Sequence, residues 1–141
     1  MYLSKRNPRD CPGSIKITKK AQEKELKLLK RKCLQLWAAK VKDRAGRKCE
    51  VCGKKKRLNS HHTESFSTNK TLRYSLENGI SACITCHKFG RFALHKSFCT
   101  TFIFMSKKRM TDFEYLLLHY KDKTEITKEF LLNRIEELGE E

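Results

Sequence analysis

Two cysteine pairs frame a short segment of the chain and have the spacing of metal ligands. Cys49 and Cys52 form one Cys-x-x-Cys pair, and Cys83 and Cys86 form a second, thirty residues later. Such a turn lets two thiolates reach one ion, and structural zinc takes four ligands in a tetrahedron. The spacing therefore predicts one shared four-cysteine zinc site, which holds the fold and does no chemistry. Four buried or redox-active cysteines are one alternative, and a three-cysteine site completed by His87 is another.

Between and directly after these pairs lie polar side chains suited to hydrolysis of a phosphodiester. His61 and His62 are adjacent near the end of a predicted strand, so their side chains should point in different directions. One ring can contact a metal ion while the other takes a proton from water, a task that a near-neutral pKa suits. A divalent ion would stabilise the phosphate charge and the leaving oxygen. His87 is a further candidate ligand.

The order Cys-x-x-Cys, His-His, Asn, Cys-x-x-Cys-His resembles the HNH endonuclease family over residues 44–96. The resemblance implies an α+β protein with a ββα-metal core stapled by the four-cysteine zinc site. It also implies that His61 and His87 bind the catalytic ion and that His62 is the general base. Asn78 would hydrogen-bond the backbone of the loop that aims the base. By family precedent, the products would carry a 5′-phosphate and a 3′-hydroxyl.

The third protein ligand of the catalytic ion departs from the family pattern. Some families place it four residues after the last histidine, where this chain has Arg91, and a guanidinium cannot serve. We expect a helix to start near Ile84 and to carry both His87 and His95 on one face, so His95 is the candidate. Histidine ligands favour transition metals, whereas phosphate oxygens in the shell would admit Mg²⁺, so Mg²⁺, Mn²⁺ and other transition metals remain open.

A narrower resemblance concerns the run from Leu72 to Ile80, the pair with His87, and His95-Lys96. This run is similar to small phage HNH proteins, some grouped with NinG-type recombination nucleases that act on branched DNA. Phage nucleases that assist genome packaging and free-standing homing nucleases are rival interpretations. These readings imply partners in phage replication, recombination or packaging, a location in the host cytoplasm, and a homodimer where two strands are cut.

The net charge of +16 lies almost entirely in the first part of the chain. Residues 1–60 hold 20 Lys and Arg against 5 Asp and Glu, whereas residues 61–141 hold 12 against 11. A basic half of this kind predicts a surface for double-stranded or branched DNA, because phosphate contacts release counterions. A solvated lysine face is the plain alternative, and RNA stays open as a substrate. The candidate phosphate contacts are Lys54, Lys55, Lys56, Arg57, Arg73, Lys88 and Arg91, with Arg73 first because a guanidinium can grip a phosphate with two bonds.

A non-catalytic zinc module that binds nucleic acid is the competing class of protein. Such a module has no need of His62 or Asn78, so these two residues discriminate between the classes. A membrane partner is not expected, because no apolar run approaches the roughly eighteen residues of a membrane span. Residues 1–6 also lack the apolar core of a secretory signal. We therefore expect a soluble, intracellular protein in which Cys11, Cys33 and Cys99 stay reduced.

Four segments are expected along the chain. They are an irregular basic arm over residues 1–17, a long helix over 18–46, the HNH core over 47–96, and helices over 97–141. In the long helix, apolar residues recur every three or four positions, and Gly46 should end it. Trp37 in this helix is interpreted as a packing residue and not as a base-stacking one.

Shorter elements are expected around the candidate site. The pattern predicts a strand from Leu58 to His62, a loop over residues 63–71, and extended segments over Leu72–Tyr74 and Gly79–Ala82. Thr111 heads a predicted capping box before an apolar helix, and Thr127 precedes a final helix.

Overall fold

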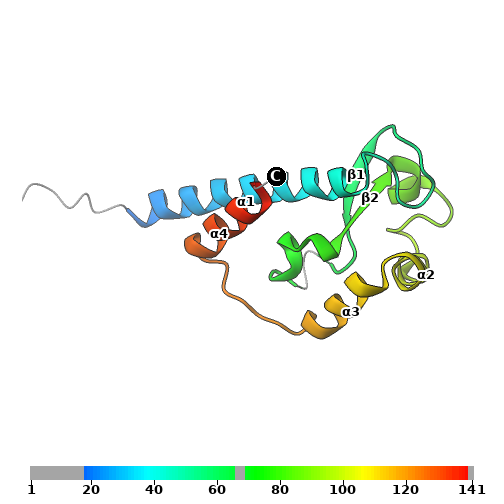
Figure 1. Cartoon of the computed structure of the whole chain (residues 1–141). Helices are drawn as coiled ribbons and strands as arrows, with labels where there is room; N and C mark the ends of the chain where they lie inside the picture. Colours follow the sequence, from blue (N-terminus) through cyan, green and yellow to red (C-terminus); the bar gives the residue numbers. More distant parts are fainter. Residues whose placement is uncertain (1–17, 66–68, 140–141) are drawn as a thin grey trace, which may run out of the picture.

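The computed structural model describes residues 18–65 and 69–139 (Figure 1). The predicted basic arm over residues 1–17, with Cys11, lies outside the described residues. The described chain forms a mixed fold of helices around one small sheet. In chain order its elements are α1 (Lys19–Arg44), β1 (Leu58–His62), the short 3₁₀ helices η1 (Leu72–Tyr74) and η2 (Leu76–Asn78), β2 (Gly79–Cys83), the single π-helical turn η3 (Thr85–Phe89), α2 (Phe98–Lys108), α3 (Met110–His119) and α4 (Lys128–Gly139).

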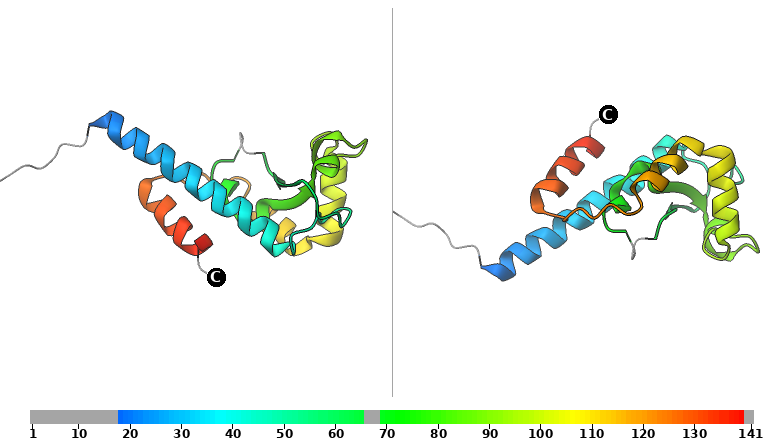
Figure 2. Two further views of the ribbon diagram at one scale, coloured as in Figure 1. Left: turned by 90° about the horizontal axis from the view of Figure 1, so that it is seen from above. Right: turned by 90° about the horizontal axis from the view of Figure 1, so that it is seen from below.

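The predicted long N-terminal helix is present as α1, which spans Lys19–Arg44. Its N-cap is Thr18, whose hydroxyl accepts a hydrogen bond from the Ala21 N–H. Past its end, Gly46 adopts φ +64, which favours glycine. Helix α4 packs along α1, and the β-hairpin packs against the C-terminal part of α1 (Figures 1 and 2).

Two clusters of buried side chains hold these elements together. One lies between the hairpin, α2 and α3, and contains Leu72, Ile80, Ala82, Leu94, Met105 and Leu116 together with two of the paired cysteines. The other lies between α1, α4 and η1, and contains Cys33, Trp37, Val41, Tyr74, Leu131 and Leu138. Burial of these side chains away from water is the main favourable contribution to folding.

The hairpin is a two-stranded antiparallel sheet in which β1 pairs with β2. Its register places His61 opposite Ile80 and His62 opposite Gly79. The strand predicted from Leu58 to His62 is confirmed, and the extended segment predicted from Gly79 continues to Cys83.

Helix α1 approaches the end of this hairpin very closely. A Cβ atom on Gly79 would lie 2.2 Å from Val41 Cγ2 and 3.1 Å from Trp37 Cζ2. The Ser60 hydroxyl donates to the Ala38 carbonyl oxygen at 2.7 Å. Arg44 donates to the Gly79 carbonyl oxygen at the same distance of 2.7 Å. The absence of a side chain at position 79 therefore permits α1 to dock on the hairpin.

Three expectations about local structure are wrong. Residues 72–74 form a 3₁₀ turn and not an extended segment, because Leu72 is buried in one core and Tyr74 in the other. The helix expected to run from Ile84 to His95 is only the turn η3, which ends where Gly90 adopts an extended conformation. Helix α3 begins at Met110, so Thr111 is not its N-cap.

The C-terminal part of the described chain is helical, as expected. Helix α2 was not delimited by the sequence pattern, and its N-cap is Ser97, whose hydroxyl accepts from the Thr100 N–H at 3.2 Å. Thr127 does precede the final helix, and its hydroxyl accepts from the Phe130 N–H at 3.1 Å. Among the residues that the structure describes, no helix is both long enough and apolar enough to cross a membrane.

The close approach at Gly79 generates a prediction about stability. Gly79→Ala should lower the free energy of unfolding by about 1–3 kcal/mol, because the new methyl group overlaps Val41 and α1 must shift. Urea denaturation would measure the change. Gly139→Ala is the matched control, since a Cβ there meets nothing within 4 Å. Equal stability of the two variants would contradict the docking of α1 described above.

Candidate metal centres and hydrolytic site

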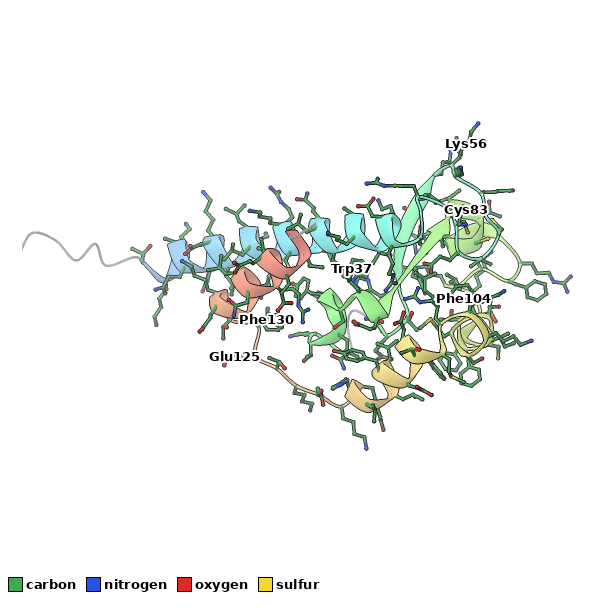
Figure 3. The ribbon with its side chains drawn as sticks, viewed as in Figure 1. Trp37, Lys56, Cys83, Phe104, Glu125 and Phe130 are labelled. Carbon is green, nitrogen blue, oxygen red and sulfur yellow. The ribbon has the colours of Figure 1, made fainter. Side chains whose placement is uncertain are left out.

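The four paired cysteines converge on one point, as the spacing predicted. Their sulfur atoms all lie within 4.8 Å of one another, and Cys52 Sγ is 3.6 Å from Cys83 Sγ. Zinc–sulfur bonds of about 2.3 Å in a tetrahedron place neighbouring sulfurs about 3.8 Å apart. The cluster therefore fits a structural zinc ion. Figure 3 labels Cys83, at the end of β2 where the second pair begins.

Local structure prepares both halves of this cluster. The turn after Cys49 closes with a hydrogen bond from the Gly53 N–H to the Cys49 carbonyl oxygen at 2.8 Å, and Gly53 has φ +77. Burial raises the pKa of Cys83, but hydrogen bonds from the Cys86 backbone N–H and the neighbouring thiols outweigh it and bring that pKa down to about 7. Burial and the neighbouring thiols raise the pKa of Cys86 in the same cluster, so Cys83 ionises before Cys86 and is the readier metal ligand of the two.

A second cluster consists of His61, His87 and His95. One ring nitrogen from each lies within 4.8 Å of the others, and Nε2 of His87 is 2.9 Å from Nε2 of His95. The Nδ1 atoms of His61 and His87 are buried and have no hydrogen-bond partner in the described structure. Three imidazole nitrogens that approach one another this closely fit a bound divalent cation.

Burial keeps two of these rings neutral. Burial, together with charge repulsion from His95 and His87, lowers the pKa of His61 to about 3. Burial likewise lowers the pKa of His87 to about 4, with a contribution from His95. Both rings therefore carry a lone pair at neutral pH, which is the form that coordinates a metal ion.

His95 reaches this cluster by a route different from the expected one. It does not lie on a helix with His87. After Gly90 the chain turns back, and the Leu94 N–H donates to the Cys86 carbonyl oxygen at 2.8 Å while the His95 N–H donates to the His87 carbonyl oxygen at 3.2 Å. These backbone bonds bring the two imidazoles together, so the juxtaposition was expected but its structural cause was not.

His62 lies apart from the three-histidine cluster and contacts α1. Its ring is stacked on Trp37, with centroids 3.9 Å apart and planes 9° from parallel. Its Nε2 is 2.9 Å from the Arg73 carbonyl oxygen. Because a carbonyl oxygen only accepts, Nε2 carries the hydrogen and Nδ1 is the nitrogen able to take up a proton. Burial lowers the pKa of His62, so the ring is neutral near pH 7.

Asn78 is fully buried and ties the loop after β1 to the start of β2. Its Oδ1 accepts from the Glu64 N–H at 2.6 Å. Its Nδ2 donates to the carbonyl oxygens of Leu72, at 3.0 Å, and Glu64, at 3.3 Å. The Thr63 N–H also donates to the Asn78 carbonyl oxygen at 2.9 Å. This single side chain therefore fixes both ends of the loop whose Arg73 carbonyl contacts His62.

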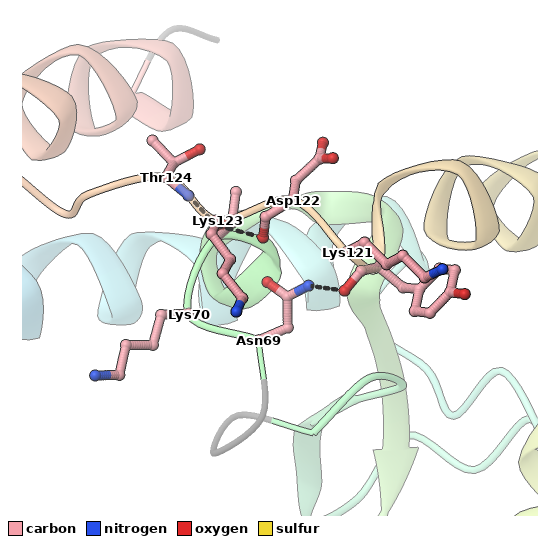
Figure 4. Close-up of a pocket in the computed structure, with 8 residues that line it drawn as sticks. Asn69, Lys70, Lys121, Asp122, Lys123 and Thr124 are labelled. Carbon is pink, nitrogen blue, oxygen red and sulfur yellow. Dashed lines mark hydrogen bonds between the residues drawn. The ribbon is translucent and has the colours of Figure 1, made fainter.

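One pocket of about 440 Å³ is lined both by the three-histidine cluster and by His62. It is lined by Ser60, His61, His62, Thr63, Ser65, His87, Lys88, Leu94, His95, Phe98 and Thr101. A larger pocket, of about 700 Å³, lies between residues 69–71 and 120–124 (Figure 4). Its walls are joined by a hydrogen bond from the Asn69 amide to the Tyr120 carbonyl oxygen at 2.8 Å. The larger pocket holds no histidine or cysteine, so the smaller one is the candidate hydrolytic site.

The predicted phosphate contacts are not all near this pocket. Lys88 lines it, and Arg91 is exposed on the following loop. The basic turn over residues 54–57 precedes β1, whereas His62 is the last residue of that strand. The strand itself, four residue steps long, therefore separates the turn from His62 by about 13 Å. Figure 3 labels Lys56 on the same side of the molecule as Cys83, at the end of the sheet where β1 begins and β2 ends. Arg73 is half-buried, and its carbonyl oxygen contacts the pocket's His62.

Sequence reasoning missed a partly buried ionic cluster that supports the site. Arg109 pairs with Glu50 at 2.7 Å and also with Asp112. The second oxygen of Glu50 accepts from the Ser81 N–H at 2.6 Å. This cluster ties the start of α3 to the first cysteine turn and to β2. Glu50 lies 59 residues before Arg109, and no local pattern marks these two residues as partners.

Comparison with known families agrees with this geometry. Residues 49–89 match the model of the HNH endonuclease family. No curated protein and no solved structure matches the chain. The matched segment is thus similar to an HNH endonuclease domain, and it spans both cysteine pairs, the two adjacent histidines, Asn78 and His87. The family is generally one of DNA nucleases that use divalent metal ions. The narrower likeness to phage NinG-type proteins stays a prediction.

The cysteine cluster generates a prediction about zinc and stability. Cys83→Ser should lose zinc and melt at a lower temperature, because the free energy of binding to structural zinc sites, about 10–16 kcal/mol in small domains, is available only to the folded state. Elemental analysis and thermal denaturation would measure both effects. Cys99→Ser, which alters an exposed cysteine outside the cluster, is the control. A Cys83→Ser protein that stays folded and zinc-loaded would refute the shared site.

Proposed function

We propose that the chain is a metal-dependent endonuclease that hydrolyses phosphodiester bonds in DNA. One observation carries the proposal: three histidines that fit a divalent ion and a neutral histidine with a defined tautomer line the same pocket. A nucleic-acid-binding zinc module would need neither group. The family match over residues 49–89 supports the same conclusion independently.

In this proposal His62 is the general base. Nδ1 takes a proton from a water molecule, and that water attacks the scissile phosphorus in line with the leaving oxygen. The Arg73 carbonyl oxygen accepts the hydrogen bond from Nε2. This bond fixes the tautomer beforehand and stabilises the imidazolium that forms, because the partial negative charge of the carbonyl lies next to the new positive charge.

His61, His87 and His95 would hold the divalent ion. When bound, such an ion acts as a Lewis acid that stabilises the charge on the phosphate and on the leaving 3′ oxygen. Three imidazoles favour a transition metal such as Mn²⁺ over Mg²⁺, although phosphate oxygens in the shell would also admit Mg²⁺. Lys88 at the pocket wall adds a positive charge that can hold a neighbouring phosphate.

The substrate within DNA is a finer proposal. Branched or recombination DNA of a phage is the substrate implied by the narrower sequence resemblance, and packaging-associated cleavage is the alternative. Labelled linear duplex, flapped and four-way-junction DNA, incubated with Mg²⁺, Mn²⁺ or EDTA, would separate these readings. Preferred cleavage of the junction or flap supports the recombination role, whereas preferred cleavage of linear duplex favours the packaging role.

The assignment of the base generates a direct test. His62→Ala should abolish cleavage while zinc content and DNA affinity stay close to those of the wild type, because the base contributes only to the chemical step. Gel-based cleavage and fluorescence anisotropy would measure the two properties. His119→Ala, an exposed histidine on α3, is the matched control and should cleave normally. Retained cleavage by His62→Ala would remove it from the mechanism. A wild-type protein that binds DNA but cuts it under no metal would promote the zinc-module alternative.

The proposed ligand set predicts the effect of removing His95. In zinc-loaded protein, His95→Ala should weaken Mn²⁺ binding by more than about tenfold, since the loss of even an outer partner of a metal ligand costs about that much. Isothermal titration with Mn²⁺ would measure the affinity, and His119→Ala again serves as control. Unchanged Mn²⁺ affinity would mean that His61 and His87 bind the ion without a third imidazole.

A further inference from the structure

We propose that Trp37 is a positioning residue for His62, so that α1 is part of the catalytic centre. This inference rests on the proposed nuclease function. The family match begins at residue 49, whereas Trp37 lies twelve residues earlier on α1. Its indole covers one face of the His62 imidazole at 3.9 Å, with the planes 9° from parallel. Trp37 therefore acts from outside the matched domain on the side chain that would take the proton.

Among the described residues, two contacts of different kinds orient the imidazole of His62. The Arg73 carbonyl oxygen holds one edge through Nε2, and the indole holds one face. A single hydrogen bond still allows a ring to tilt about the bond axis. A flat aromatic surface against the face removes that freedom and makes no hydrogen bond to either nitrogen. The stack therefore fixes the plane of the ring and leaves Nδ1 as the proton-accepting atom.

The indole is itself immobile. Trp37 is 1 % exposed, and its Nε1–H donates to the Ser75 carbonyl oxygen at 2.8 Å. Figure 3 shows the labelled Trp37 between α1 and the segment that carries η1 and η2. A buried, hydrogen-bonded indole cannot swing away without leaving a polar N–H unpaired, which would cost about 1–3 kcal/mol. The indole face that His62 stacks on is therefore held in a fixed position.

The docking of α1 on the hairpin sets the position of the indole relative to the strand. The Ser60 hydroxyl bonds the Ala38 carbonyl, one residue from Trp37. Gly79 pairs with His62 in the sheet, and because it has no side chain it leaves room for Trp37 and Val41. These contacts between α1 and the hairpin therefore lie next to the stacked rings of Trp37 and His62. Ordinary core packing would explain the burial of Trp37, but not a parallel contact with a polar ring in the hydrolytic pocket.

The test compares Trp37→Phe and Trp37→Leu with Leu131→Ala. Leu131 is fully buried in the same core but lies on α4. Trp37→Leu should lower kcat about 10²-fold, the cost of a misplacement near 1 Å, with KM for DNA and bound Mn²⁺ unchanged. Trp37→Phe, which keeps a flat face, should recover most of the rate. Leu131→Ala should lower the melting temperature without lowering kcat at a temperature where all variants are folded.

Several results would overturn the inference. Equal kcat values for Trp37→Leu and Leu131→Ala would mean that Trp37 only packs. A parallel rise in KM, or loss of bound Mn²⁺, would place its role in binding. Failure of Trp37→Phe to exceed Trp37→Leu would exclude the flat face as the cause. In each of these cases the wild type still cleaves DNA, so the proposed nuclease function stands; a wild type that never cleaves would remove both proposals together.

The contact itself has a separate readout. Trp37 is the sole tryptophan of the chain, so its fluorescence reports directly on the stacked ring. His62→Ala should change the emission intensity of the folded, zinc-loaded protein, whereas His119→Ala should not. An unchanged spectrum in His62→Ala would show that the two rings do not touch in solution and would overturn the inference without reference to cleavage.

Discussion

A two-stranded sheet is marginally stable in water on its own, and the site of this protein is built on such a sheet. The convergence of four thiols supplies the missing constraint. One cysteine pair precedes β1 and the other closes β2, so a shared zinc ion would join the two strands at the same end and fix their register. The histidines depend on that register: His61 lies on β1, and His87 directly follows Cys86.

The surroundings of His61 and His62 differ because their side chains lie on opposite sides of the strand β1. Adjacent residues of β1 point to different surroundings, so His61 faces the rings of His87 and His95 while His62 faces the indole of Trp37. Burial keeps His61 and His87 neutral and suited to a cation. A carbonyl oxygen fixes the hydrogen of His62 on Nε2. In the proposed mechanism, two adjacent residues of one strand would thus divide metal binding and proton transfer between them.

The elements outside the matched domain hold this arrangement from two directions. Helix α1 covers the hairpin through Gly79 and Ser60, and α4 packs on α1 to complete the second core. On the other side, the ion pairs of Arg109 link α3 to the first cysteine turn and to β2. The sheet and its cysteine turns therefore lie between α1 on one side and α2 and α3 on the other. The pocket owes its shape to both.

Local patterns in the sequence were sufficient for the parts of the structure that depend on nearby residues. The Cys-x-x-Cys spacing, the capping residue Thr18, the stop at Gly46 and the strand from Leu58 to His62 each follow from interactions within a few residues. Periodicity failed where the fold competes with local preference. Leu72 and Tyr74 are drawn into separate cores and form a 3₁₀ turn, and α3 begins before the apparent capping box at Thr111.

The sequence by itself determined the chemical inventory: four thiols, the adjacent imidazoles, an asparagine and a basic first half. Only the tertiary structure decided which of these groups meet. His95 reaches His87 through a loop that folds back, because Gly90 ends the helical turn that would have carried it. The indole of Trp37 and the carbonyl of Arg73 reach His62 from positions 25 residues before it and 11 residues after it. Contacts over such separations are set by how elements pack, and no local pattern encodes them.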